Sequence, residues 1–210
     1  MSGLTDNLDS IAGEIRQTLT DKDVAREKAL PLCREVIRLA SQAIRAVHRQ
    51  EYVEAAEHLK SARRLLDDTE QALVRHDEFR YSGFVRDAQK EFAEGSILLA
   101  LVTGKRMPSQ QKLRIDIVAY LNGMGEAVGE LRRFLLDSMR QGNLSRGEEI
   151  LAAMDDIYSV LVTMDFPDAI TGGLRHTTDM VRGVLERTRS DLTLAMRQKD
   201  LEDRISKFEK

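Results

Sequence analysis

The sequence predicts an all-α protein, an antiparallel bundle of six to seven long helices. Apolar residues recur every three or four positions along nearly all of the 210 residues, which is the repeat of amphipathic helices. Charged residues make up 32% of the chain and aromatic residues 5%, with three prolines and no tryptophan. Such a composition favours long helices with solvated faces over sheets, which are enriched in β-branched and aromatic residues. No linker or change of composition divides the sequence, so we expect residues 1–210 to form one domain.

The first two helical segments are expected over about residues 4–49 and 51–76. Pro31 should kink or split the first segment, because proline lacks a backbone N–H and its ring clashes with the preceding turn. In the second segment, helical spacing predicts one buried stripe, formed by Val53, Ala56, Leu59, Ala62 and Leu66. Short connections between such segments make successive helices pack antiparallel.

The third and fourth segments are expected over about residues 82–104 and 114–141. Each ends beside a glycine, Gly104 and Gly142, and glycine suits the left-handed conformation that commonly follows a helix. Pro108 marks the short connector between the two segments.

The last two segments are expected over about residues 146–164 and 173–207. Ser145 and Glu148 have the spacing of a capping box, in which both side chains satisfy free N–H groups at the start of a helix. Pro167 is expected to break the chain between the two helices, because proline has no N–H to continue the helical hydrogen bonds.

Cysteine usage and hydropathy predict a cytoplasmic protein that does not enter the membrane. The single cysteine, Cys33, excludes a disulfide framework and any site with several thiolate ligands, and indicates a reducing compartment. The first residues include acids where a signal peptide would have a basic start. The longest apolar run, residues 97–102, is far shorter than the roughly 20 residues that cross a bilayer.

Two pairs of acids stand at helical spacing on neighbouring segments. Glu91 and Glu94 lie on the third segment, and Glu126 and Glu130 on the fourth. Spacings of three and four place each pair on one helical face. If the segments pack together, the four carboxylates repel one another unless a cation neutralises them, and such hard oxygen ligands suit Mg²⁺ or Mn²⁺. Ions held in this way can activate water for phosphodiester hydrolysis.

From spacing alone, a bland interpretation is the more common one. Glutamate is a strong helix former, and nearby Lys90, Arg132 and Arg133 are suitable salt-bridge partners for the four acids. The net charge of −3 and pI of about 5.9 also count against general attraction to nucleic acid, although a local basic patch remains compatible with them.

The strings that carry these acids resemble the translin/Trax family. GFVRDAQKEFAEGSILLAL (83–101) is similar to the Trax helix with a Gln-Glu-x-x-Glu pattern, and AYLNGMGEAVGELRR (119–133) is similar to the helix with Tyr-Leu-x-Gly, an acid and Gly-Glu-Leu. Translin has apolar or basic residues at these positions, so the sequence sides with Trax. It departs from Trax at Glu126, where that pattern has Asp, and at Ala119, where the family usually has an acid.

This resemblance implies an endoribonuclease that depends on Mg²⁺ or Mn²⁺ and cleaves mainly single-stranded RNA inside a closed, octameric shell. The catalytic and metal-binding residues would be the four carboxylates, Glu91, Glu94, Glu126 and Glu130. An acid that binds no ion would serve as the general base. RNA is the expected partner, with single-stranded DNA also compatible, and the oligomer is expected to consist of copies of this chain.

The resemblance also suggests where RNA would bind. Arg80 and Arg86 fall where translin has arginines in its nucleic-acid-binding stretch, and with Lys90 they form a basic tract that we expect to contact phosphates. The alternative is a solvated face paired with neighbouring acids.

Two other functions stay open. The chain could form a translin-like RNA-binding shell without catalysis, or a helical scaffold with no nucleic-acid role. Within the catalytic interpretation, Glu51 and Glu54 match the local Trax string more literally than Glu91 and Glu94 do. We reject that pair because it lies too early in the chain and its downstream context does not fit.

Overall fold

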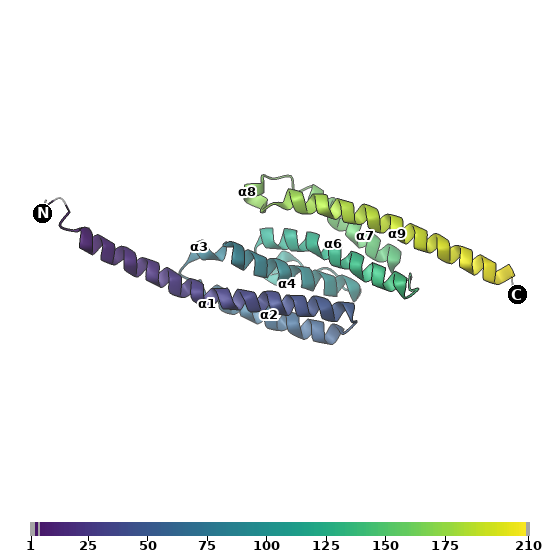
Figure 1. Ribbon diagram of the computed structural model, residues 1–210, viewed down its shortest axis with the longest axis horizontal. Coiled ribbons are helices and arrows are strands. Elements are labelled where there is room, and N and C mark those ends of the chain that lie inside the picture. Colours follow the sequence, from purple (N-terminus) through teal and green to yellow (C-terminus); the bar gives the residue numbers. More distant parts are fainter. Residues whose placement is uncertain (1–2, 4, 209–210) are drawn as a thin grey trace.

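The computed structural model describes residues 3 and 5–208, and over this range it contains helices and no strands (Figure 1). Six helices are long, and α3, α5 and α8 are single turns of four residues. The predicted all-α fold with six to seven long helices is therefore confirmed. Leu4, at which the first segment was expected to begin, lies outside the described residues. The helices are α1 (Leu8–His48), α2 (Tyr52–Ala72), α3 (Asp77–Arg80), α4 (Gly83–Val102), α5 (Gln110–Leu113), α6 (Ile117–Arg140), α7 (Gly147–Val162), α8 (Asp168–Thr171) and α9 (Leu174–Phe208).

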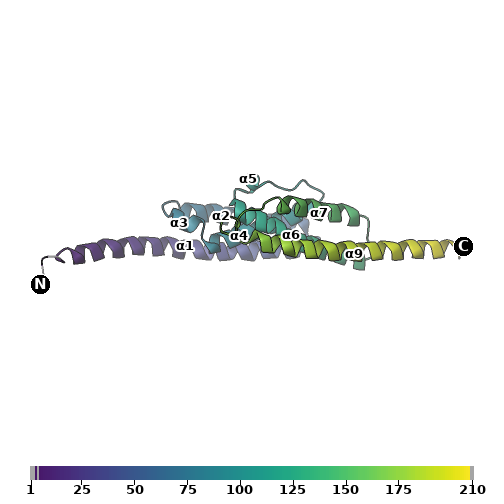
Figure 2. The ribbon, with the colours of Figure 1, turned by 90° about the horizontal axis from the view of Figure 1, so that it is seen from above.

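Helices α4 and α6 form the centre of the bundle. Helix α1 packs against α2 and α4, α4 packs against α6, and α6 packs against α7 and α9. Seen from above, α1 and α9 lie along one side of the molecule, whereas α2, α5 and α7 lie along the other (Figure 2). The first half of α1 and the last half of α9 project beyond the bundle at opposite ends (Figure 1).

The predicted interruption at Pro31 is not found, because α1 is a single helix from Leu8 to His48. Pro31 itself is exposed, so the carbonyl that loses its N–H partner, that of Glu27, lies on the solvated side of the helix. The opposite face, which carries Ala29 and Cys33, is buried against the rest of the bundle. Packing of this continuous apolar face outweighs the loss of one hydrogen bond.

The predicted stripe of α2 is partly wrong. Val53 is 82% exposed, and Ala56 is exposed as well. The observed stripe alternates steps of four and three residues and keeps the three other predicted members; it consists of Ala55, Leu59, Ala62, Leu66 and Thr69. Only a residue in this register faces α1, which is why neighbouring apolar residues in the first turn of α2 face solvent.

The glycines end two central helices as predicted. Gly104 has φ +70° and Gly142 has φ +72°. The N–H of Lys105 donates to the carbonyl of Ala100 at 2.8 Å, and that of Asn143 donates to Ser138 at 2.9 Å. These bonds close the ends of α4 and α6, because a left-handed residue turns the chain back onto the last carbonyls of the helix.

The predicted capping box before α7 is wrong. Arg146 precedes the helix, and no side chain caps its first N–H groups. The hydroxyl of Ser145 instead donates a hydrogen bond to Asn143 Oδ1 at 2.8 Å, within the turn that follows α6. The break at Pro167 is confirmed, since α8 begins directly after it. Over the described residues, no helix has the length and apolar character needed to cross a membrane.

Candidate metal centre

A glycine brings the two acid-bearing helices into close contact. A Cβ atom at Gly123 of α6 would lie 2.6 Å from the backbone oxygen of Lys90 and 2.8 Å from the Cβ of Ala93, both on α4. Only a residue without a side chain fits at this crossing. The close approach places the acids of α4 opposite those of α6.

Three carboxylates meet at this crossing. Glu91, Glu94 and Glu126 each offer one oxygen, and these oxygens all lie within 4.8 Å of one another. We call these three residues the acid triad. They line an open hollow of about 460 Å³ between α1, α4, α6 and α9, to which Glu130 also contributes. Glu94 lies deepest, with 8% of its surface exposed.

The acid triad carries an electrostatic cost. Burial raises the pKa of Glu94 to about 8, and the negative charges of Glu91 and Glu126 add to the shift. Burial and the charge of Glu126 also raise the pKa of Glu91. Within the described residues, neither Glu91 nor Glu94 has a hydrogen bond or an ion pair at its carboxylate. Like charges that are held together away from water resist ionisation in this way.

Lys90 offsets part of this charge. Its Nζ donates to Glu126 Oε1 at 2.7 Å, across the α4–α6 contact. Burial disfavours the charged amine, but the hydrogen bond and the charge of Glu126 outweigh it, so the pKa of Lys90 is raised. A lysine that was expected to contact phosphate is thus bound to a member of the acid triad.

The fourth predicted acid, Glu130, is held separately. Its Oε2 lies 2.5 Å from Nε2 of His48, the last residue of α1, and 3.8 Å from Nη1 of Arg133. The hydrogen bond from His48, which outweighs the effect of burial, lowers the pKa of Glu130, and the charge of Arg133 contributes. The structure therefore brings three of the four predicted acids together and gives the fourth its own partners.

A divalent cation fits the donor set of the acid triad. The three ligands are carboxylate oxygens from two packed helices, and oxygen ligands suit Mg²⁺ or Mn²⁺ better than they suit zinc, which prefers nitrogen and sulfur. Two of the carboxylates have no hydrogen-bond donor of their own among the described residues. A cation would offset their mutual repulsion.

Each cation of the predicted basic tract lies beside an acidic side chain. Arg80 lines a pocket of about 470 Å³ among α2, α3, α4 and the connector 103–116, and pairs with Glu70 and Asp77 at 3.4 Å each. Arg86 lies 3.9 Å from Asp116 at the start of α6. With Lys90 bound to the acid triad, the three cations face three different environments.

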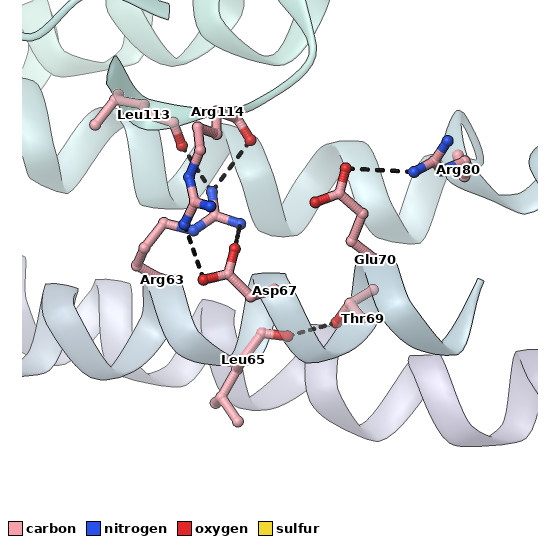
Figure 3. Close-up of polar contacts among 8 residues, drawn as sticks. All are labelled: Arg63, Leu65, Asp67, Thr69, Glu70, Arg80, Leu113 and Arg114. Carbon is pink, nitrogen blue, oxygen red and sulfur yellow. Dashed lines mark hydrogen bonds and ion pairs between the residues drawn. The ribbon is translucent and has the colours of Figure 1, made fainter. Parts of the chain in front are cut away.

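Arg63 and Arg114, which line the same pocket as Arg80, belong to a network of paired charges (Figure 3). Arg63 of α2 donates to the backbone oxygen of Leu113 at 2.6 Å and to Asp67 at 3.0 Å, while Arg114 donates to the other oxygen of Asp67 at 2.9 Å. This network holds the connector onto α2. Each arginine of the network has an acidic partner.

The rejected acids, Glu51 and Glu54, lie on the surface in ion pairs. Arg49 contacts Glu51 at 2.5 Å and Glu54 at 3.8 Å. Sequence reasoning missed His48 as a member of the site. Two signals could have found it: the string Ala46-Val47-His48 shares the weak family similarity, and His48 follows the apolar Ile44 by four residues, on the same helical face.

Proteins similar to this all-α chain are known from both sequence and structure. No family model matches the sequence. An uncharacterised protein of Methanocaldococcus jannaschii is 28% identical over 196 residues, which cover 91% of this chain and 85% of that protein.

Solved structures of C3PO, the translin/Trax complex, are similar over most of this chain. AfC3PO in complex with duplex RNA is 32% identical, with a TM-score of 0.80 over 88% of this chain and 96% of that chain. A second structure of AfC3PO has a TM-score of 0.78 at 31% identity and the same coverage. An apo form of NeC3PO, at 19% identity and a TM-score of 0.76 over 90% and 97%, shares the fold. The chain belongs to the translin/Trax family.

Proposed function

We propose that this chain is a divalent-metal-dependent endoribonuclease that binds and cleaves RNA, mainly single-stranded, inside an oligomeric shell. The acid triad carries the proposal. Three carboxylates lie within 4.8 Å of one another, and two of them have no hydrogen bond or ion pair among the described residues, an arrangement that a structural role does not require. Such a site is costly without a cation, and costly groups of this kind cluster at functional sites.

RNA as the substrate is supported by the relative AfC3PO, which has been solved with duplex RNA and is 32% identical to this chain. Because AfC3PO binds a duplex, both single-stranded and double-stranded RNA belong in the test. An internal site in a shell would also reconcile a net charge of −3 with an anionic substrate, since the potential that matters is that of the cavity wall.

A closed homo-oligomer, which we propose to be an octamer, would cover the apolar residues of the projecting helix ends. On α1 these exposed residues are Leu8, Ile11, Ile15, Leu19 and Val24, and on α9 they are Leu194, Met196, Leu201 and Ile205. Closed symmetric assembly is the usual way in which such surfaces are buried.

In the proposed reaction, the acid triad would hold Mg²⁺ or Mn²⁺. The bound ion would supply Lewis-acid stabilisation of the phosphodiester and lower the pKa of a water. Glu130 would take up the proton of the attacking water. Its closest contacts, to His48 and Arg133, are both made by Oε2, so Oε1 is the oxygen that would accept this proton. Lys90, beside Glu126, would place a positive charge near the bound phosphate.

A second candidate function is RNA binding without catalysis. The observation in its favour is that two of the four acids already have partners within the chain: Lys90 pairs with Glu126, and Glu130 contacts both His48 and Arg133. In this case the acids would only link α4 to α6 and α1.

The test compares cleavage of labelled RNA by the parent chain and by two variants. Single-stranded and duplex RNA are incubated with Mg²⁺, Mn²⁺ or EDTA. We expect the parent to cleave with either metal, and Glu91→Gln to lose cleavage while it keeps its assembly and RNA binding. The matched control, Glu51→Gln, alters an exposed acid and should cleave normally. A parent that binds RNA without metal-dependent cleavage would establish the second function in place of the first.

A further inference from the structure

The contact between α1 and Glu130 has features of a positioning device. His48 ends α1, and its side chain is only 6% exposed. Its Nε2 lies 2.5 Å from Glu130 Oε2, a residue 82 positions away in the sequence. An ionised carboxylate only accepts hydrogen bonds, so Nε2 carries the hydrogen and donates it. Hydrogen bonds to a charged acceptor are shorter and stronger than neutral ones.

Glu130 is the polar partner of this buried ring. The other ring nitrogen, His48 Nδ1, is buried and has no hydrogen-bond partner among the described residues. Burying a polar group without a partner is costly, so an imidazole placed here gains its compensation from the Nε2 contact with Glu130. A leucine or methionine would fill the same space at lower cost if packing were the only requirement.

The hydrogen bond also explains why the four acids divide into three and one. Glu130 stands one helical turn after Glu126 and lines the same hollow, yet it is not part of the acid triad. Its Oε2 is engaged by His48 and Arg133 on the side of α1. Without that engagement, nothing among these contacts would hold the carboxylate away from the hollow that it lines with the acid triad.

We infer that His48 is a positioning residue that keeps Glu130 out of the ligand set of the ion and reserves it as the base. This inference rests on the proposed function. It reaches beyond that function because it assigns a role to a residue on a third helix, and because it predicts opposite effects on metal affinity and on turnover. Affinity of oxygen sites for divalent cations rises with the number of charged ligands. A released Glu130 would therefore tighten metal binding and at the same time remove the base.

The decisive measurement is the Mn²⁺ affinity of the full-length chain, followed by electron paramagnetic resonance of free Mn²⁺. We expect His48→Ala to bind Mn²⁺ about tenfold more tightly than the parent, because a fourth carboxylate becomes available. His48→Gln keeps an N–H donor in reach of Glu130 and should bind like the parent. In the double variant His48→Ala, Glu130→Gln the gain should vanish, because the released group carries no charge.

Turnover should move in the opposite direction. Loss of a positioned general base costs roughly 100-fold or more in kcat. We therefore expect the kcat of His48→Ala to be lower than that of the parent by about this factor, with an unchanged KM. His48→Gln should recover most of the rate. Far-ultraviolet circular dichroism of each variant, recorded in EDTA, ensures that only folded protein is compared.

Each outcome decides between the alternatives. If His48 instead supports a metal ligand, His48→Ala should weaken Mn²⁺ binding by roughly 10- to 100-fold, which would overturn the inference. Unchanged affinity, or cleavage by His48→Ala at the parent rate, would overturn it too. A parent that binds Mn²⁺ and does not cleave refutes the proposed nuclease activity alone, and the affinities then decide the ligand set. A parent that binds no Mn²⁺ refutes both.

Discussion

Replacing Glu94 by glutamine keeps the size of the side chain and removes its charge. The pKa of Glu94 is raised from 4.5 to about 8, chiefly by burial and then by Glu91 and Glu126. The folded state therefore holds this proton more tightly than the unfolded state does. The contribution of the protonated Glu94 carboxyl to the free energy of unfolding is fully present below pH 4.5 and is lost as the pH rises towards 8. Glu94→Gln has no proton to lose, so it escapes this loss.

The size of the effect follows from the shift. One pKa unit corresponds to about 1.4 kcal/mol, so the shift from 4.5 to about 8 lowers the free energy of unfolding by about 5 kcal/mol at pH 8.5. Near pH 5 the loss is under about 1 kcal/mol. We expect Glu94→Gln to exceed the parent in stability at pH 8.5 in EDTA, and this advantage to shrink by about 4 kcal/mol at pH 5. Urea denaturation at both pH values and one protein concentration measures the difference.

Glu130→Gln provides a control of opposite sign. The pKa of Glu130 is lowered, first by the hydrogen bond from His48, so its contribution is present above the unfolded pKa and is lost as the pH falls. This variant should be less stable than the parent at pH 8.5. Addition of Mn²⁺ should erase the advantage of Glu94→Gln, because the ion stabilises only the parent. If the stability difference between parent and Glu94→Gln does not change between pH 5 and 8.5, the reasoning about the acid triad is wrong.

Three other predictions concern the packing, the assembly and the basic residues. Gly123→Ala should lower the free energy of unfolding by about 1–3 kcal/mol or more, because the new Cβ would collide with the backbone of α4. Gly129→Ala, on the same helix, places its Cβ in open space and should raise the free energy of unfolding by up to about 1 kcal/mol. Urea denaturation measures both. Light scattering should report an octamer, and a particle of 23.8 kDa at micromolar concentration would remove the shell. Arg80→Ala and Arg86→Ala should each weaken RNA binding about equally across sequences and flatten its salt dependence in anisotropy titrations, and unchanged salt slopes would assign both residues to structural ion pairs.

Local features of this protein were readable from the sequence because their causes are local. The helical repeat identified the long helices, and glycine marked the ends of α4 and α6, since left-handed backbone is a property of the residue itself. The spacing of Glu91 and Glu94 placed both on one face of α4, because the geometry of a single helix determines which of its residues share a face. Family resemblance then selected these acids over Glu51 and Glu54, a choice that periodicity alone did not make.

The tertiary structure decided everything that depends on a partner from another helix. Pro31 is tolerated because the apolar face around it is buried by distant helices, and Val53 is exposed because the position of α1 sets the register of α2. The division of the four acids into a triad and a separate Glu130 depends on His48, which lies 82 residues away. No spacing within one helix contains that information, because the energy of a charged group is set by the donors, charges and solvent around it in space.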